Sequence, residues 1–156
     1  PGSQPIAADM PARQTDDDSL SCLRYRKTVQ TKGLTMANIL LADDEEDVGI
    51  IVKERLQASG HETVWVADGT TAWELFGRGG FDLVILDINM PGINGYQLCD
   101  MIKDSDRSDT PVLLLSAYVS EVYFPQKCRA DACISKPFQA DYLVDSITKL
   151  LQKKAG

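Results

Sequence analysis

The sequence of 156 residues predicts an α/β domain in which helices cover both faces of a five-stranded parallel sheet. Five short apolar segments alternate with segments whose apolar residues recur at helical spacing, which is typical of parallel sheets with helical crossovers. The apolar segments are nearly unbroken rather than alternating with polar residues, which indicates strands buried on both faces. Right-handed crossovers then make the sheet doubly wound.

The first half of the domain is predicted to contain two strand–helix pairs. A strand over residues 39–41 precedes a helix over 46–59, which Gly60 ends. A second strand over 63–66 precedes a short helix over 69–76. The residues assigned to the inner face of the first helix are Val48, Ile51, Val52 and Leu56.

The second half is predicted to contain three strands and two helices. The strands cover residues 83–86, 112–115 and 132–134. The helices cover residues 95–103 and 139–153. The residues assigned to the inner face of the last helix are Tyr142, Leu143, Ile147, Leu150 and Leu151.

Residues 1–35 differ in composition from the rest of the chain. They are rich in Pro, Gln, Thr and Ser, and they hold an acidic triplet followed by a short basic stretch. We interpret 1–35 as a flexible tail or linker, with its first three residues as a tag remnant. The folded domain is expected over 36–156, with Met36 as a natural start.

The charge and hydropathy exclude several classes of function. The formal net charge of −7 argues against direct nucleic acid binding, because phosphates would be repelled. It favours metal ions or basic protein surfaces as partners. The chain has neither an apolar run long enough to span a membrane nor the apolar centre of a signal peptide, so we expect a cytoplasmic protein that does not contact a membrane.

The cysteines and the single histidine carry little functional signal. The four cysteines show no metal-binding spacing and are expected to be free thiols: Cys22, Cys99, Cys128 and Cys133. Cys133 is read as a small buried apolar residue of a central strand. His61 follows Gly60 in a turn and is expected at the surface.

Polar residues stand at the ends of four predicted strands. Asp43 and Asp44 follow the first, Asp87 the third, Ser116 the fourth, and Lys136 the fifth. Ligands of such sheets bind beyond the carboxyl ends of the strands, so these side chains are expected to converge.

Three close carboxylates repel one another unless a cation lies among them, and oxygen ligands on loops favour Mg²⁺. A carboxylate beside Mg²⁺ and a lysine can attack a phosphoryl group, and Lys136 and Ser116 would then bind the transferred oxygens. Each residue also has a structural alternative. Asp44 or Glu45 could cap the first helix, Ser116 could be a cap, and Lys136 could be a solvated surface lysine.

Four segments of the chain, "ILLADDEEDV", "DLVILDINMPGINGYQLC", "PVLLLSA" and "RADACISKPF", closely resemble the receiver domain of two-component response regulators. The resemblance spans about residues 37–153. It implies a flavodoxin-like (βα)5 fold with strand order 2-1-3-4-5, and Asp87 as phosphoacceptor. It also implies a cis peptide bond before Pro137.

The resemblance further implies a metal site for Mg²⁺, with Mn²⁺ as a substitute. Asp44 would bind the metal directly, Asp43 mainly through water, and the backbone carbonyl of Asn89 would complete a ligand set that includes Asp87. Ser116 and Lys136 would contact the phosphoryl group.

The function implied is a phosphorylation-dependent signalling module rather than an enzyme, apart from its own phosphoryl transfer and slow dephosphorylation. Its expected partners are a histidine kinase or histidine phosphotransfer protein, a downstream target or output domain, and a second copy through the face of the fourth and fifth helices. The alternative is a degenerate receiver that binds proteins without phosphorylation. A phosphatase on a similar sheet is disfavoured, because Asn89 stands where such enzymes have a second acid.

The chain departs from the receiver pattern in two places. Cys133 replaces the usual aromatic residue three positions before Lys136, which puts the usual hydroxyl–aromatic coupling in doubt. Pro125 lies where the fourth helix should be, so that helix is expected to be shortened, displaced or replaced by a loop.

Overall fold

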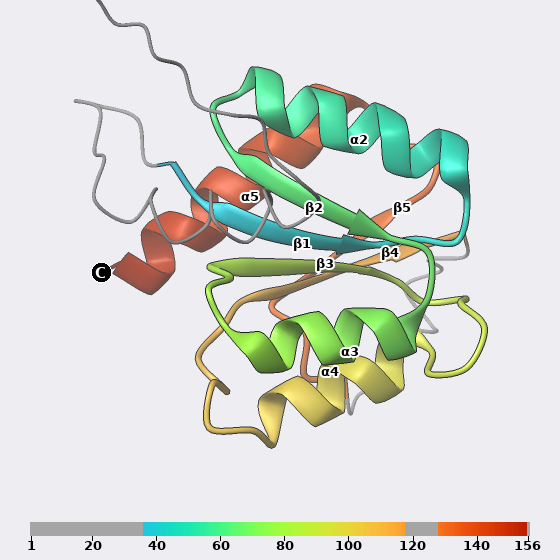
Figure 1. Ribbon diagram of the computed structural model, residues 1–156. Helices are drawn as coiled ribbons and strands as arrows, with labels where there is room; N and C mark the ends of the chain where they lie inside the picture. Colours follow the sequence, from blue (N-terminus) through green and yellow to red (C-terminus); the bar gives the residue numbers. More distant parts are fainter. Residues whose placement is uncertain (1–35, 118–127, 156) are drawn as a thin grey trace, which may run out of the picture.

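The computed structural model describes residues 36–117 and 128–155, which form five strands and four helices (Figure 1). The strands are β1 (Asn38–Ala42), β2 (Glu62–Val66), β3 (Leu83–Asp87), β4 (Val112–Ser116) and β5 (Ala132–Ser135). The helices are α2 (Glu46–Ala58), α3 (Gly69–Arg78), α4 (Gly95–Lys103) and α5 (Ala140–Ala155). All nine predicted elements are confirmed, with boundaries that differ by at most two residues.

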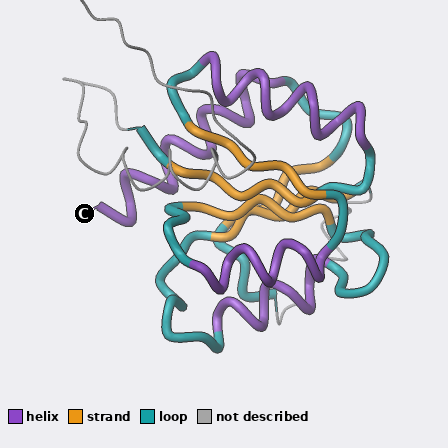
Figure 2. Tube along the Cα trace, viewed as in Figure 1, coloured by secondary structure: helices purple, strands orange, loops and turns teal. Residues whose placement is uncertain are grey.

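The five strands form one parallel sheet in the order β2-β1-β3-β4-β5. Helices α2 and α5 cover one face, and α3 and α4 cover the other, as Figures 1 and 2 show. The predicted doubly wound α/β class and the strand order implied by the resemblance are therefore confirmed. This order places β1 and β3 side by side at the centre of the sheet.

Two apolar clusters form the core, one on each face of the sheet. Every residue of β1, β3 and β4 is buried, and alternate side chains of these strands enter opposite clusters. Leu40 and Leu86 face α3 and α4, whereas Leu41 and Ile85 face α2 and α5. Burial on both faces explains the unbroken apolar runs in the sequence.

Two residues assigned to inner helix faces lie at the surface. Ile51 of α2 is 61% exposed and Tyr142 of α5 is 59% exposed, so both assignments are wrong. Successive helical residues are rotated by about 100°. The buried rows include Val52 and Leu143, and the residue directly before each is therefore rotated away from the core.

His61 is buried, with 7% of its surface exposed, so its predicted surface position is wrong. Its Nδ1 accepts a hydrogen bond of 3.2 Å from the backbone N–H of Ala37, next to the start of β1. A ring nitrogen that accepts a hydrogen bond carries no proton, and burial also disfavours the charged ring. Burial accordingly lowers the pKa of His61.

We expect His61 to make the domain sensitive to acid. Because its pKa is lower in the folded chain, its contribution to stability is complete above the unfolded pKa of about 6.5 and is lost as the pH falls below that value. His61→Asn keeps an acceptor near Nδ1 but does not titrate. The difference in unfolding free energy between wild type and H61N, measured by urea denaturation, should fall from pH 7.5 to pH 5.5. A constant difference would contradict this assignment.

Several sequence-based predictions concern residues outside the described ranges. They are the flexible tail over 1–35, the state of Cys22, and the altered helix around Pro125. Within the described residues, Cys99, Cys128 and Cys133 are free thiols, as expected. No helix of residues 36–117 and 128–155 combines the length and apolarity needed to cross a bilayer.

Candidate functional site

The predicted site residues gather at the carboxyl edge of the sheet. Asp43 directly follows β1, Asp87 is the last residue of β3, and Ser116 is the last residue of β4. Lys136 follows β5, and its backbone N–H donates to the carbonyl of Ser116 at 2.7 Å. The parallel topology therefore brings together residues that are widely separated in the sequence.

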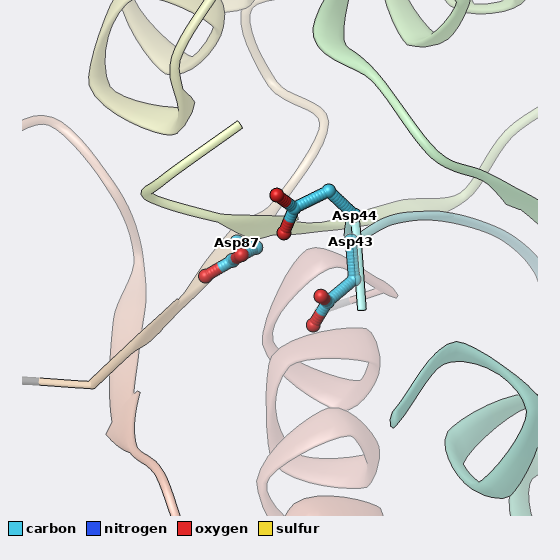
Figure 3. A group of neighbouring side chains, drawn as sticks. All are labelled: Asp43, Asp44 and Asp87. Carbon is cyan, nitrogen blue, oxygen red and sulfur yellow. The ribbon is translucent and has the colours of Figure 1, made fainter. Parts of the chain in front are cut away.

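Three carboxylates form the centre of this edge (Figure 3). Asp43, Asp44 and Asp87 each offer an oxygen, and these oxygens all lie within 4.8 Å of one another. Asp43 and Asp87 are buried, whereas Asp44 is exposed. The cluster is thus open to solvent on the side of Asp44.

Among the described residues, Lys136 is the cation that contacts this cluster. Its Nζ lies 2.9 Å from Oδ2 of Asp43, 2.8 Å from Oε1 of Glu45 and 3.4 Å from Oδ1 of Asp87. The Lys136 side chain is only 12% exposed, so it is not the solvated surface lysine of the alternative reading. Burial opposes its charge, but its pairing with the carboxylates of Asp43 and Glu45, to which the charge of Asp87 adds, outweighs that effect and raises its pKa.

The Asp43 carboxylate is fully buried and incompletely hydrogen-bonded. Its Oδ1 accepts the backbone N–H of Glu45 at 2.9 Å, which fixes the turn into α2. Its Oδ2 pairs with the Lys136 ammonium by proximity, but without hydrogen-bond geometry. A buried carboxylate oxygen with an unused lone pair, next to two more carboxylates, fits a hard cation such as Mg²⁺.

The electrostatics of Asp87 also favour a cation. Burial is the main cause that raises its pKa, the charge of Asp43 adds to it, and Lys136 only partly offsets both. Together they raise the pKa of Asp87 to about 6. A bound divalent ion would lower this pKa by stabilising the ionised form.

The loop after β3 holds its shape through glycines. Gly92 has φ of 77°, a left-handed conformation that glycine adopts readily. A Cβ at Gly95 would lie 2.5 Å from the carbonyl oxygen of Asp87, so only glycine lets α4 begin this close to the end of β3. Asn94 and Gln97 form a capping box that starts α4.

The remaining predictions for this edge have mixed outcomes. The Lys136–Pro137 peptide bond is cis, as the resemblance implies. Glu45 is the N-cap of α2, but its side chain makes no cap hydrogen bond and pairs with Lys136 instead. Asn89 is exposed in the loop two residues after Asp87, and its role as a carbonyl ligand stays a prediction.

Sequence reasoning missed two residues that contribute to the site, Glu45 and Trp65. Glu45 was considered only as a cap, although a third acid directly after an acidic pair is a usable signal. Trp65 of β2 was read only as a strand residue, yet its indole Nε1–H donates to the backbone carbonyl of Asp43 at 2.9 Å. Nothing in the sequence pattern marks this contact.

Cys133 lies on the edge strand β5, not on a central strand, and it is half-buried. It packs against the core cluster that faces α3 and α4, as Tyr96 and Cys128 do. Burial raises the pKa of Cys133, and it raises the pKa of Cys99 to about 12, so both are protonated thiols at neutral pH. Cys133 therefore behaves as a small apolar side chain, as expected.

A doubly wound parallel sheet with an acidic cluster and a lysine at its carboxyl edge is the arrangement expected of the receiver class of signalling domains. The family model described as response regulator receiver domain matches residues 39–148, so the chain belongs to this family. Residues 39–148 of this chain are thus a response regulator receiver domain of two-component signalling.

Curated relatives agree with this assignment. Sensory transduction protein RegX3 of Mycolicibacterium smegmatis is 32% identical over 122 residues, which are 77% of this chain and 53% of RegX3. The uncharacterized transcriptional regulatory protein YrkP of Bacillus subtilis is 38% identical over 107 residues, which are 67% of this chain and 45% of YrkP. The chain spans about half the length of these relatives.

Solved structures give the same result. The response regulator TrrA of Thermotoga maritima, in complex with Mg²⁺ and BeF, is 37% identical with a TM-score of 0.67, over 74% of this chain and 99% of TrrA. The chemotaxis response regulator CheY4 of Vibrio cholerae is 28% identical with a TM-score of 0.70, over 74% of this chain and 99% of CheY4.

Proposed function

We propose that this domain accepts a phosphoryl group on Asp87 from a histidine kinase or a histidine phosphotransfer protein. The observation that carries the proposal is the cluster of Asp43, Asp44 and Asp87, open to solvent at Asp44, with Lys136 beside it. The solved structure of TrrA with Mg²⁺ and BeF supports it, because that relative holds these species.

In this proposal an Asp87 carboxylate oxygen attacks the phosphorus of the donor. The bond between phosphorus and the donor nitrogen breaks, and the imidazole leaves with its electron pair and takes up a proton. Mg²⁺, or Mn²⁺ in its place, would be held by the three aspartates and the Asn89 carbonyl, and would neutralise charge on the transferred oxygens. Lys136 and Ser116 would contact those oxygens.

The same geometry supports a switch. Lys136 is shared among Asp43, Glu45 and Asp87, so a phosphoryl dianion on Asp87 would compete for its ammonium. Because Lys136 and Ser116 join the ends of β5 and β4, their movement would alter the surface around β5 and α5. That surface would bind a downstream protein, an output domain or a second copy of the chain.

Exposed apolar residues suggest where the phosphoryl donor docks. Ile50 and Ile51 are 42% and 61% exposed on the first turns of α2. This helix directly follows residues 43–45, which we call the acidic loop. A partner that covers these two side chains would bind α2, which begins two residues after Asp44, the exposed acid of the cluster. This arrangement favours a protein donor.

The direct test is incubation with acetyl phosphate in the presence and absence of Mg²⁺. We expect up to one phosphoryl group per chain, detected by intact-mass measurement, and a large loss of labelling when EDTA removes the metal. Absence of labelling under both conditions, with a receiver of known activity labelled in parallel, would contradict the proposal.

A second candidate function is a degenerate receiver that binds partners independently of phosphorylation. It is favoured by Cys133, whose small side chain stands on β5 where receivers usually have an aromatic residue. The test measures partner binding with and without BeF₃⁻ and Mg²⁺, in a domain shown to bind both of these species. An unchanged partner affinity would support the degenerate receiver over the phosphorylation switch.

A further inference from the structure

The strand β2 holds the acidic loop through two contacts with Asp43. The backbone N–H of Asp43 donates to the carbonyl of Val66 at 3.1 Å, which extends the β1–β2 pairing by one residue. The carbonyl of Asp43 accepts the indole Nε1–H of Trp65 at 2.9 Å. Both ends of residue 43 are therefore tied to the neighbouring strand.

The indole reaches this carbonyl because α2 has a glycine beneath it. A Cβ at Gly49 would lie 2.2 Å from Nε1 of Trp65 and 2.6 Å from its Cε2, so any other residue would displace the ring. Glycine is less favourable than alanine in a helix interior, so its presence here needs a packing reason. Trp65 and Gly49 thus form a matched pair from β2 and α2.

The carbonyl that Trp65 binds belongs to the peptide group between Asp43 and Asp44. Rotation of this peptide group would swing the Asp44 carboxylate away from Asp87, and repulsion among the three carboxylates favours such a rotation. We propose that Trp65, seated on Gly49, is a positioning residue that holds the Asp43–Asp44 peptide in the orientation that binds a divalent cation. This inference rests on the metal site of the proposed function and deepens it.

Trp65→Phe removes the N–H donor but keeps an aromatic ring. We expect its Mg²⁺ dissociation constant, measured by isothermal titration calorimetry, to rise about threefold to tenfold, as loss of one hydrogen bond implies. The matched control is Trp73→Phe, because Trp73 lies on α3 and stacks on Phe76 within the cluster on the other face. W73F should bind Mg²⁺ as the wild type does.

The partner of the ring provides a second test. Gly49→Ala should weaken Mg²⁺ binding by a similar factor, because its methyl group displaces the indole. Gly77→Ala is the matched control, since Gly77 also lies in a helix but a Cβ there would meet nothing within 4 Å. G77A should leave the Mg²⁺ affinity unchanged.

A spectroscopic test needs no change at Trp65. The chain has two tryptophans, so Trp65 is the only one in W73F. Its indole N–H resonance should be protected from hydrogen exchange and should shift on Mg²⁺ addition, with the affinity found by calorimetry. The positioning role would be overturned by an indole N–H resonance that is unprotected and does not shift on Mg²⁺ addition. A W65F variant with the Mg²⁺ affinity of the wild type would overturn it as well. Failure of the wild type to bind Mg²⁺ would instead overturn the metal site itself.

Discussion

Replacing Asp87 with asparagine is expected to abolish phosphoryl incorporation and, in metal-free buffer at pH 7.5, to stabilise the fold. The amide cannot attack phosphorus as a carboxylate does, so labelling by acetyl phosphate should fall to background. The stabilisation follows from burial of Asp87 and its repulsion by Asp43, which raise its pKa from 3.8 to about 6. Each pKa unit corresponds to about 1.4 kcal/mol, so the rise from 3.8 to about 6 means that the ionised side chain destabilises the fold by about 3 kcal/mol.

The sign of this effect gives its dependence on pH. The folded chain binds the Asp87 proton more tightly than the unfolded chain does, so the unfolding free energy decreases as the pH rises from about 4 to about 6. The stability difference between D87N and wild type should be small below pH 4 and constant above pH 6. Urea denaturation in EDTA measures it, and Asp100→Asn on the exposed face of α4 is the control. A D87N variant less stable than wild type at pH 7.5 would contradict the electrostatic account.

Lys136→Met is expected to destabilise the fold strongly in metal-free buffer. Methionine keeps most of the side-chain length but removes the charge, and this leaves the fully buried Asp43 without its cation. Removal of one partner of a buried ion pair typically costs about 3–5 kcal/mol. We expect a loss near the lower end by urea denaturation, because Asp87 can take up a proton to relieve the repulsion.

Two further variants make this prediction specific. The double variant Asp43→Asn, Lys136→Met should recover much of the lost stability, because it removes the unpaired charge along with its partner. Lys149→Met, at an exposed position of α5, should change the unfolding free energy by less than about 0.5 kcal/mol. If K136M and K149M were equally stable, Lys136 would have no electrostatic role in the fold. K136M should also slow phosphoryl incorporation, by about a hundredfold if it binds the transferred oxygens.

The sequence predicted the positions of the described elements well because their signals are local. The run from Leu83 to Leu86 is apolar since β3 is buried on both faces, and it stops at Asp87 where the strand reaches the sheet edge. The errors at Ile51 and Tyr142 have a common cause. Periodicity indicates a helix, but it leaves the rotation of the apolar face uncertain by one residue when the apolar positions are close together.

The error at His61 has a different origin. A histidine after a glycine in a turn has the local features of a surface residue, but Nδ1 accepts a hydrogen bond from Ala37 at the start of β1. That contact depends on how the turn after α2 packs against a strand 24 residues away in the chain. Burial of polar side chains is decided by such distant partners, and the local sequence does not contain them.

The sequence by itself determined the order of strands and helices and the presence of acids, a hydroxyl and a lysine at strand ends, because each follows from residues adjacent in the chain. Only the tertiary structure decided how these groups share their partners. Lys136 pairs with three carboxylates, one of which belongs to Glu45, 91 residues away in the chain. The Trp65 indole donates to the Asp43 carbonyl across the space left by Gly49. Hydrogen bonds and ion pairs depend on distances of a few tenths of an ångström. Those distances are set by strand register and helix packing, which exist only once the whole sheet has formed.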